Sequence, residues 1–363
     1  MKIKETLFYN TLKRCYFRMR AFLIPERMYA HIKYYILYHK KLGIEKPQTF
    51  DEKIWWLKLH YFNPLMTICT DKYLVRKYVE KCGLRDILNE CYANFTSVDD
   101  IDIEKLPNEF FLKCNHLSGG NIICTKDNFD KERIKKIFRP LLRNNFYYYG
   151  FEYNYKHIKP QIVIEKILRP LDGGSLLDYK FMCFAGVPRL LFLDIGACDK
   201  DGGHSEHYYR NVYDMRFNLL EIKETRDNFL DDSIQKPKNF DYMVECAKIL
   251  SKPFPHCRVD LYNVDGKVYF GEITFFHGSG YNHIEPHKAD LEIGSWIPLE
   301  FSTVTISALL ALEITTLSAL SNRLYPCGAL ISTRLYVPFF KPLIVTSPAT
   351  IVVVAPVVPF GTT

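Results

Sequence analysis

One stretch near residue 260 constrains the fold of this chain more than any other. Alternating polar and apolar residues over residues 258–262 predict a β-strand, and residues 267–273 predict a second one. Between them, residues 263–266 (Asn-Val-Asp-Gly) have the composition of a tight turn. Residues 257–281 are therefore predicted to form an antiparallel hairpin followed by a glycine-rich loop.

Strand pairing about that turn is expected to bring Asp260 and Glu272 close together. Two adjacent carboxylates repel each other, and a divalent cation with oxygen ligands usually relieves that repulsion. Thr274 lies two residues beyond Glu272, faces the same side and adds a neutral oxygen. The glycines of residues 278–280 let the backbone approach a ligand closely. The hairpin is thus either a metal site or a surface turn with solvated acids.

Charge is distributed unevenly along the chain. The 363 residues are 48% hydrophobic and 25% charged, as in a globular protein of two or three domains. Residues 1–46 hold eleven Lys or Arg against three Glu, and many aromatic residues lie among them. This segment is predicted either to contact an anionic membrane surface or to pack as a helix on its own domain. The basic residues form no sustained cluster, which argues against nucleic acid as a partner.

The eleven cysteines form no C-x-x-C pair and no regular framework. Basic residues interrupt any apolar signal core near the N-terminus, and no run of about 18 apolar residues predicts a spanning helix. Scattered free thiols are typical of a reducing cytosol. We therefore expect a cytoplasmic protein that at most contacts the inner face of the membrane.

A second informative stretch covers residues 109–124. An apolar strand carries Lys113 and leads into a loop with Ser118, Gly119 and Gly120 before a further apolar strand. A strand lysine beside a glycine loop is typical of a phosphate clamp, in which loop N–H groups cover the phosphates. The pattern equally fits an ordinary hairpin with a Gly-Gly turn. The order of glycine and lysine excludes a Walker A loop.

Helical patterns occur on both sides of these strands. Thr49 and Glu52 have capping-box spacing and predict a helix over residues 49–59. Amphipathic patterns predict further helices over residues 71–82 and 240–252.

These features follow one another in a distinctive order. A lysine strand with a glycine loop comes first, then an apolar strand ending in Glu-Lys, a D-x-K strand and the R-x-D…E-x-T hairpin. This order resembles the ATP-grasp superfamily. The segments T-F-D-E-K-I-W-W-L-K, D-K-Y-x-V-R-x-Y-V, D-Y-K-F-x-C-F-x-G, F-P-H-C-R-V-D-L-Y and G-E-I-T-F are similar to its teichuronopeptide-biosynthesis branch. That branch is found in bacterial capsule and cell-wall polysaccharide loci, and its members are often named glycosyltransferases.

The resemblance covers residues 47–299 and implies an α+β ATP-grasp fold, in which two lobes with antiparallel sheets clamp a nucleotide. It implies that Lys113 and Lys180 contact the phosphates of ATP and that the loop of residues 118–120 covers them. It also implies that Arg258 stabilises the transition state. The hinge that meets the adenine edge is expected at three residues: Glu165, Lys166 and Leu168.

For the metal, the resemblance implies that Asp260 and Glu272 bind Mg²⁺. Thr274 stands where the superfamily usually has asparagine. A hydroxyl oxygen can also bind magnesium, so one ion is expected and a second is left open.

The implied chemistry starts from a carboxylate, which is a poor electrophile because it would have to expel oxide. Transfer of the γ-phosphoryl group of ATP makes an acyl phosphate, and an amine then displaces phosphate to form an amide. This transfer needs positioning and charge neutralisation more than covalent catalysis by the protein. The expected activity is an ATP- and Mg²⁺-dependent carboxylate–amine ligase, which attaches an amino acid or amine to a carboxylate-bearing saccharide of the bacterial surface.

Two polar groups outside these motifs have open interpretations. One is either an acceptor site or a structural loop: His204, His207, Tyr208, Arg210 and Asn211. Three histidines suggest a metal site by their number alone, without a fixed spacing: His277, His283 and His287.

Two alternative functions are also open. The Asp199-Lys200-Asp201 run fits the D-x-D pattern of a metal-dependent glycosyltransferase. A non-catalytic scaffold that binds nucleotide or polysaccharide is the other alternative.

The predicted organisation has five parts. Residues 301–363 contain only four charged residues, so residues 300–363 are expected to be a poorly ordered tail unrelated to the rest. The full division is residues 1–46 (basic, helical), 47–105 (α/β), 106–168 (small lobe), 169–299 (large lobe with the metal site) and 300–363 (tail).

Overall fold

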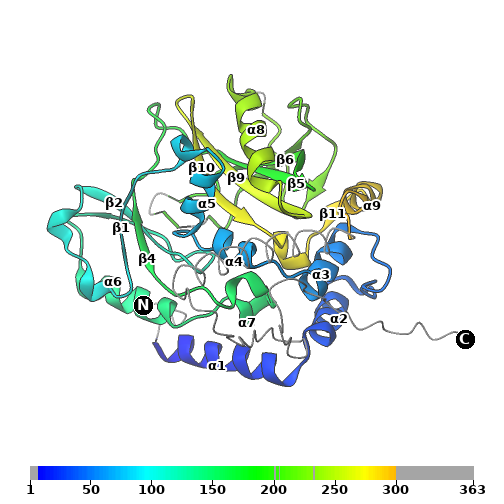
Figure 1. Ribbon diagram of the computed structural model, residues 1–363, viewed down its shortest axis with the longest axis horizontal. Helices are drawn as coiled ribbons and strands as arrows, with labels where there is room; N and C mark the ends of the chain where they lie inside the picture. Colours follow the sequence, from blue (N-terminus) through cyan, green and yellow to red (C-terminus); the bar gives the residue numbers. More distant parts are fainter. Residues whose placement is uncertain (1–6, 200–201, 204, 232–233, 300–363) are drawn as a thin grey trace, which may run out of the picture. The chain divides into compact units, whose positions relative to one another are not determined.

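The computed structural model describes residues 7–199, 202–203, 205–231 and 234–299. Three predicted features therefore lie outside the described residues: the tail over residues 300–363, the Lys200-Asp201 pair, and His204. All described residues belong to one unit, Met1–Thr305. Helices and two main antiparallel sheets build this unit (Figure 1), which confirms the α+β prediction.

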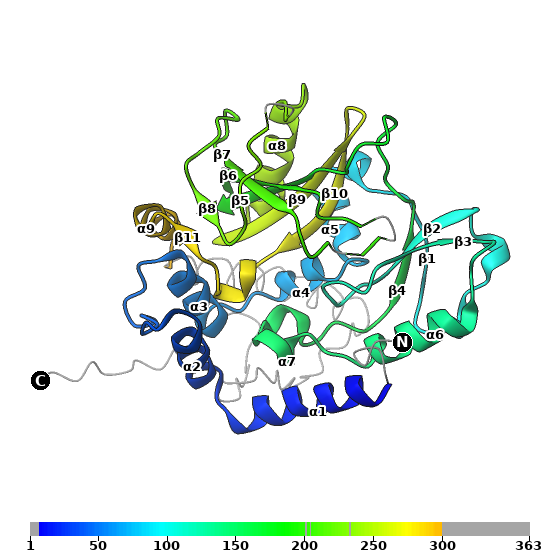
Figure 2. The same cartoon turned by 180° about the vertical axis from the view of Figure 1, so that it is seen from behind.

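The larger sheet has five antiparallel strands in the order β10-β9-β5-β6-β7. Side chains alternate between its two faces. On one face Phe181, Val259 and Leu261 are fully buried and join the core beneath helix α8 (Phe240–Ser251), seen from both sides in Figures 1 and 2. The opposite face is left for polar side chains. The strands are β5 (Asp178–Phe184), β6 (Val187–Ile195), β7 (Tyr209–Tyr213), β9 (His256–Val264) and β10 (Lys267–Thr274).

The smaller sheet has four antiparallel strands in the order β1-β4-β2-β3. Phe110 and Leu112 form a separate core with Ile134 and Phe138 of helix α6 (Lys131–Leu142). Two sheets with separate cores are what a two-lobed fold requires. The strands are β1 (Cys91–Phe95), β2 (Glu109–Cys114), β3 (Ile122–Thr125) and β4 (Ile162–Glu165).

Shorter elements surround the two sheets. The predicted capping box is confirmed, because Thr49 and Glu52 exchange hydrogen bonds at the start of α3. The prediction of a helix over residues 71–82 is wrong at its start: Asp71 accepts bonds from the N–H groups of Tyr73 and Leu74, which makes a turn. The remaining α-helices and strands are α1 (Leu7–Leu23), α2 (Glu26–Tyr38), α3 (Phe50–His60), α4 (Pro64–Thr70), α5 (Val75–Lys81), α7 (Tyr147–Gly150), α9 (His287–Ser295) and the ribbon of β8 (Lys223–Glu224) with β11 (Ile284–Glu285).

A β-bulge at Gly271 sets which face of the larger sheet the end of β10 presents. Before the bulge Phe270 pairs with Leu261, and after it Glu272 pairs with Asp260. In an unbroken ladder Gly271 would lie opposite Asp260, and the side chain of Glu272 would point to the apolar face. The extra residue turns Glu272 to the polar face.

We predict that Gly271→Val destabilises the protein by about 1–3 kcal/mol. A Cβ at this position would lie 3.0 Å from the carbonyl oxygen of Asp260 and from the ring of Tyr262. Urea unfolding would measure the loss. Lys267→Val, at an exposed position of the same strand, is the control and should change stability by less than about 0.5 kcal/mol. Equal stability of the two variants would contradict the tight packing of the bulge.

Candidate active site

The polar face of the larger sheet brings together five of the predicted site residues. Lys180 on β5 pairs with Asp260 on β9, which pairs with Glu272 on β10. Arg258 pairs with Thr274 in the adjacent row. Because directly paired residues share a face, these five side chains lie side by side, as the hairpin pattern predicted for Asp260, Glu272 and Thr274.

Arg258 holds the two acids together. Its guanidinium group donates to both oxygens of Asp260, from Nε to Oδ1 and from Nη2 to Oδ2, each at 2.6 Å. Nη2 also lies 3.2 Å from Oε1 of Glu272, which accepts a further bond from the hydroxyl of Thr274 at 3.1 Å. Asp260 is buried, whereas the Glu272 side chain is 38% exposed. A ligand from solvent therefore meets Glu272 first.

Lys180 is a buried cation surrounded by three carboxylates. Its ammonium group contacts Asp178 and lies 3.2 Å from Asp260 and 3.7 Å from Asp194. Asp178 and Asp194 were not predicted as site residues from the sequence. A signal was available, because Asp194 is the one acid within the apolar strand V-P-R-L-L-F-L-D-I.

Arg210 extends the same set of contacts. It donates to Asp194 at 2.6 and 2.8 Å and also to Glu224. Glu224 lies 3.4 Å from Nε2 of His277, whose Nδ1 accepts a bond from Arg258 at 2.8 Å. The series of contacts thus returns to Arg258 and forms a closed ring. We call this set the charge ring: Arg258, Asp260, Lys180, Asp194, Arg210, Glu224 and His277.

This arrangement resolves the open interpretation of residues 204–211 in part. Arg210 and Asn211 lie in β7 and are buried, and Asn211 exchanges hydrogen bonds with the backbone of Phe229. Both therefore hold the sheet together, in line with the structural interpretation. His207 is exposed, and Tyr208 stacks beneath the guanidinium group of Arg226.

Lys72, which the sequence analysis did not single out, connects the two sheets. Its backbone N–H donates to the carbonyl of Asn115, just beyond β2, at 3.1 Å. Its ammonium group binds Oε2 of Glu272 at 2.9 Å. Asp71 fixes the turn that contains Lys72, and it accepts a bond from the side chain of Asn115. The D-K-Y segment therefore places a third cation beside the two acids.

The charges shift the proton affinities of the site. Lys72 lowers the pKa of Glu272 well below its usual range, with help from Arg258. Burial raises the pKa of Asp178 to about 6, although Lys180 opposes it. Burial lowers the pKa of His277, so its ring is neutral and accepts the bond from Arg258.

The smaller sheet carries the other predicted nucleotide residues. Lys113 on β2 forms an ion pair of 2.7 Å with Glu165 on β4, and both side chains are largely buried. Ser118, Gly119 and Gly120 form the loop after β2, where both glycines have positive φ. The remaining two residues follow β4: Lys166 is exposed, with its carbonyl bound by Asn89, and Leu168 is half-buried.

The predicted arrangement of three histidines does not form, and the D-x-D run is described only at Asp199. Among the residues that the structure describes, no three or more His, Cys, Asp or Glu side chains gather as metal ligands. His277 is in the charge ring, while His283 and His287 are exposed and lie near Glu285 and Asp290. Asp199 of the D-x-D run belongs to a tight turn in which its backbone bonds to Gly202 and Gly203.

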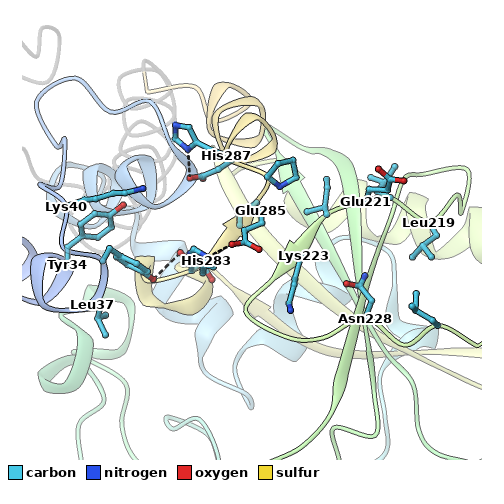
Figure 3. Close-up of a pocket in the computed structure, with 18 residues that line it drawn as sticks. Tyr34, Leu37, Lys40, Leu219, Glu221, Lys223, Asn228, His283, Glu285 and His287 are labelled. Carbon is cyan, nitrogen blue, oxygen red and sulfur yellow. Dashed lines mark hydrogen bonds and ion pairs between the residues drawn. The ribbon is translucent and has the colours of Figure 1, made fainter.

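A cavity of about 1100 Å³ lies beyond the β8–β11 ribbon, lined by α2, residues 219–230 and the start of α9 (Figure 3). Tyr34 and Lys40 line one side of it, and Lys223 and Glu285 line the ribbon side. Glu224, the neighbour of Lys223, is buried in the charge ring. The ribbon thus separates the cavity from the ring.

We predict that Arg210→Ala destabilises the protein by about 3–5 kcal/mol, because it leaves Asp194 and Glu224 buried without their main cation. Arg169→Ala is the matched control. Arg169 pairs with Glu109 at 2.5 Å, but both side chains are half exposed, so its loss should cost less than about 1 kcal/mol. Urea unfolding measures both, and similar losses would contradict a structural role for the ring.

No described helix combines the length and the apolar character needed to cross a membrane. A comparison with curated proteins finds no match.

Several solved structures are similar to parts of this chain. D-alanine–D-alanine ligase from Bacillus anthracis, complexed with ATP, is 16% identical, with 58% of this chain and 54% of that chain covered and a TM-score of 0.33. L-amino acid ligase from Bacillus licheniformis is 15% identical, with 72% of this chain and 57% of that chain covered and a TM-score of 0.42. D-alanine–D-alanine ligase from Helicobacter pylori is 15% identical, with 64% of this chain and 62% of that chain covered and a TM-score of 0.33. This chain spans less than two thirds of the length of each.

A family model gives the assignment. The model described as TupA-like ATPgrasp matches residues 52–298, more than half of the chain. The matched range includes both antiparallel sheets, Lys72, Lys113 and the whole charge ring. The chain belongs to the TupA-like ATP-grasp family.

Proposed function

We propose that this protein is an ATP- and Mg²⁺-dependent carboxylate–amine ligase. The observation that carries the proposal is the meeting of three cations, Lys72, Lys180 and Arg258, with Asp260 and Glu272 at one end of a polar sheet face. Membership of the ATP-grasp family supports the same activity.

The cations suit a polyphosphate substrate. Phosphoryl transfer spreads negative charge over the oxygens of the transferred group, and fixed cations stabilise that charge. We propose that Lys180 and Arg258 contact these oxygens, and that Lys113 meets a phosphate from the smaller sheet. Each of these cations is paired with a carboxylate, so each enters the site already charged and oriented. The loop of residues 118–120 is then free to cover the nucleotide with backbone N–H groups.

The acids fit a magnesium ion. Mg²⁺ prefers oxygen ligands and commonly takes one or two carboxylates, with phosphate oxygens and water completing the shell. Asp260 and Glu272 supply those carboxylates and the hydroxyl of Thr274 a neutral oxygen, on strands held in register by the bulge. When bound, the ion would neutralise phosphate charge. For Glu272 to bind it, the carboxylate has to exchange the ammonium group of Lys72 for the metal.

The substrates are the less defined part of the proposal. We propose that the enzyme activates a carboxylate on a bacterial cell-surface saccharide, or on its precursor, as an acyl phosphate and joins it to an amino acid or amine. All ten described cysteines are free thiols, which suits a reaction in the cytoplasm or at the inner face of the membrane.

We predict that Glu272→Gln reduces Mg²⁺-dependent ATP turnover at least 100-fold, because the amide cannot replace the carboxylate charge beside the metal. The exposed Glu132→Gln on α6 is the control and should retain turnover. Thermal unfolding would verify that both variants fold. In the wild type, ATP at ~100 times its Kd should add roughly 2.7 kcal/mol of stability in the presence of Mg²⁺. Unchanged turnover in Glu272→Gln, or stabilisation by UDP-sugars in place of ATP, would overturn the proposal.

A further inference from the structure

The two N-terminal helices expose an unusual amount of apolar surface. Ten large apolar side chains on α1 and α2 are between 45% and 88% exposed to solvent. Only seven other large apolar residues of the described chain are at least 45% exposed. They are Leu12, Tyr16, Met19, Phe22, Leu23, Met28, Ile32, Tyr35, Ile36 and Leu37. An exposed apolar patch of this size marks an interaction surface.

On α1 the exposed residues follow helical spacing. Leu12, Tyr16, Met19 and Leu23 recur at intervals of four, three and four residues, so they lie along one face. Met28, Ile32 and Tyr35 repeat the same intervals of four and three on α2. We call these seven residues, with the adjacent Phe22 and Ile36, the apolar stripe.

The opposite face of α1 is occupied by the rest of the protein. Arg20 is buried and donates to the carbonyls of Tyr148 and Tyr149 at 2.5 and 3.2 Å. The ring of Phe17 packs on that of Tyr149 at 4.4 Å. Figures 1 and 2 both show α7 on the inner side of α1. The apolar stripe therefore faces outward, because another face of α1 packs against α7.

The charge around the stripe is strongly positive. Residues 7–46 contain nine Lys or Arg and only two acids, Glu26 and Glu45. Glu45 is paired with Arg27, and Glu26 contacts the hydroxyl of Tyr147. Lys13 and Arg18 are exposed on either side of the stripe on α1. Apolar side chains flanked by cations are typical of helices that lie in the interface of an anionic bilayer.

We propose that the apolar stripe docks this protein on an anionic lipid bilayer. The apolar side chains enter the boundary between headgroups and acyl chains, and the flanking cations contact the headgroups. A second copy of the chain fits this surface less well, because two such faces would bring surplus positive charge against positive charge. The proposal does not depend on the reaction that the site carries out.

The test uses the full chain and co-sedimentation with vesicles. One set is made of phosphatidylcholine alone and the other of phosphatidylcholine with phosphatidylglycerol. The wild type should partition at least 10-fold more strongly to the phosphatidylglycerol vesicles, and added salt should weaken that binding. Equal partition to both, or no binding, would overturn the proposal.

A combined Tyr16→Ser, Met19→Ser and Phe22→Ser variant should lose at least 10-fold in partition to the phosphatidylglycerol vesicles. The control replaces two strongly exposed apolar residues away from these helices, Leu171→Ser and Leu230→Ser, and should stay within about 2-fold of the wild type. Thermal unfolding verifies that each variant folds. Unchanged binding of the triple variant would assign the membrane contact to another segment.

Light scattering tests the alternative that a second copy of the chain covers the apolar stripe. The wild type and the triple variant should have the same molar mass in the absence of vesicles. A wild-type dimer that the triple variant converts to a monomer would make the stripe a self-association face and overturn the bilayer proposal.

Discussion

The candidate site depends on a set of buried charges that support one another. Removing any one member of the charge ring leaves at least one neighbour buried without its partner, which costs more than the pair itself contributes. Arg258 is the member on which most depends, because it contacts Asp260, Glu272 and His277 at once. The ring crosses β9, β5, β6 and β7, so it also fixes how these strands align. Fold and site are therefore stabilised by the same contacts.

Much of this could be predicted from the sequence, because hairpins are local. The turn at residues 265–266 and the alternation on each side place Asp260, Glu272 and Thr274 near one another. The contacts of Lys72 and Glu224 could not be predicted from the sequence. Lys72 meets Glu272, which lies 200 residues away, and Glu224 meets Arg210, which lies 14 residues away, and no periodic pattern predicts either contact. The helix predicted to begin at Asp71 begins at Val75, because a side chain competing for backbone N–H groups overrode the amphipathic pattern.

The pairing of Lys72, Lys113 and Arg258 with carboxylates has a consequence for ligand binding. A phosphate entering the site does not find free positive charge; it has to compete with Glu272 for Lys72 and Arg258, and with Glu165 for Lys113. We therefore expect the proposed site to discriminate against singly charged anions, which gain too little free energy to displace a carboxylate held at 2.7–3.2 Å. The acids that would hold the metal thus also keep the cations oriented in its absence.

The bulge at Gly271 decides to which face of the larger sheet the side chain of Glu272 points. An unbroken ladder in place of the bulge would leave the letters G-E-I-T unchanged while pointing the glutamate at Val259 and the apolar core. A relative could therefore keep the whole motif and still be inert. The position of the bulge relative to the turn therefore decides whether Glu272 lies beside Arg258 or in the apolar core.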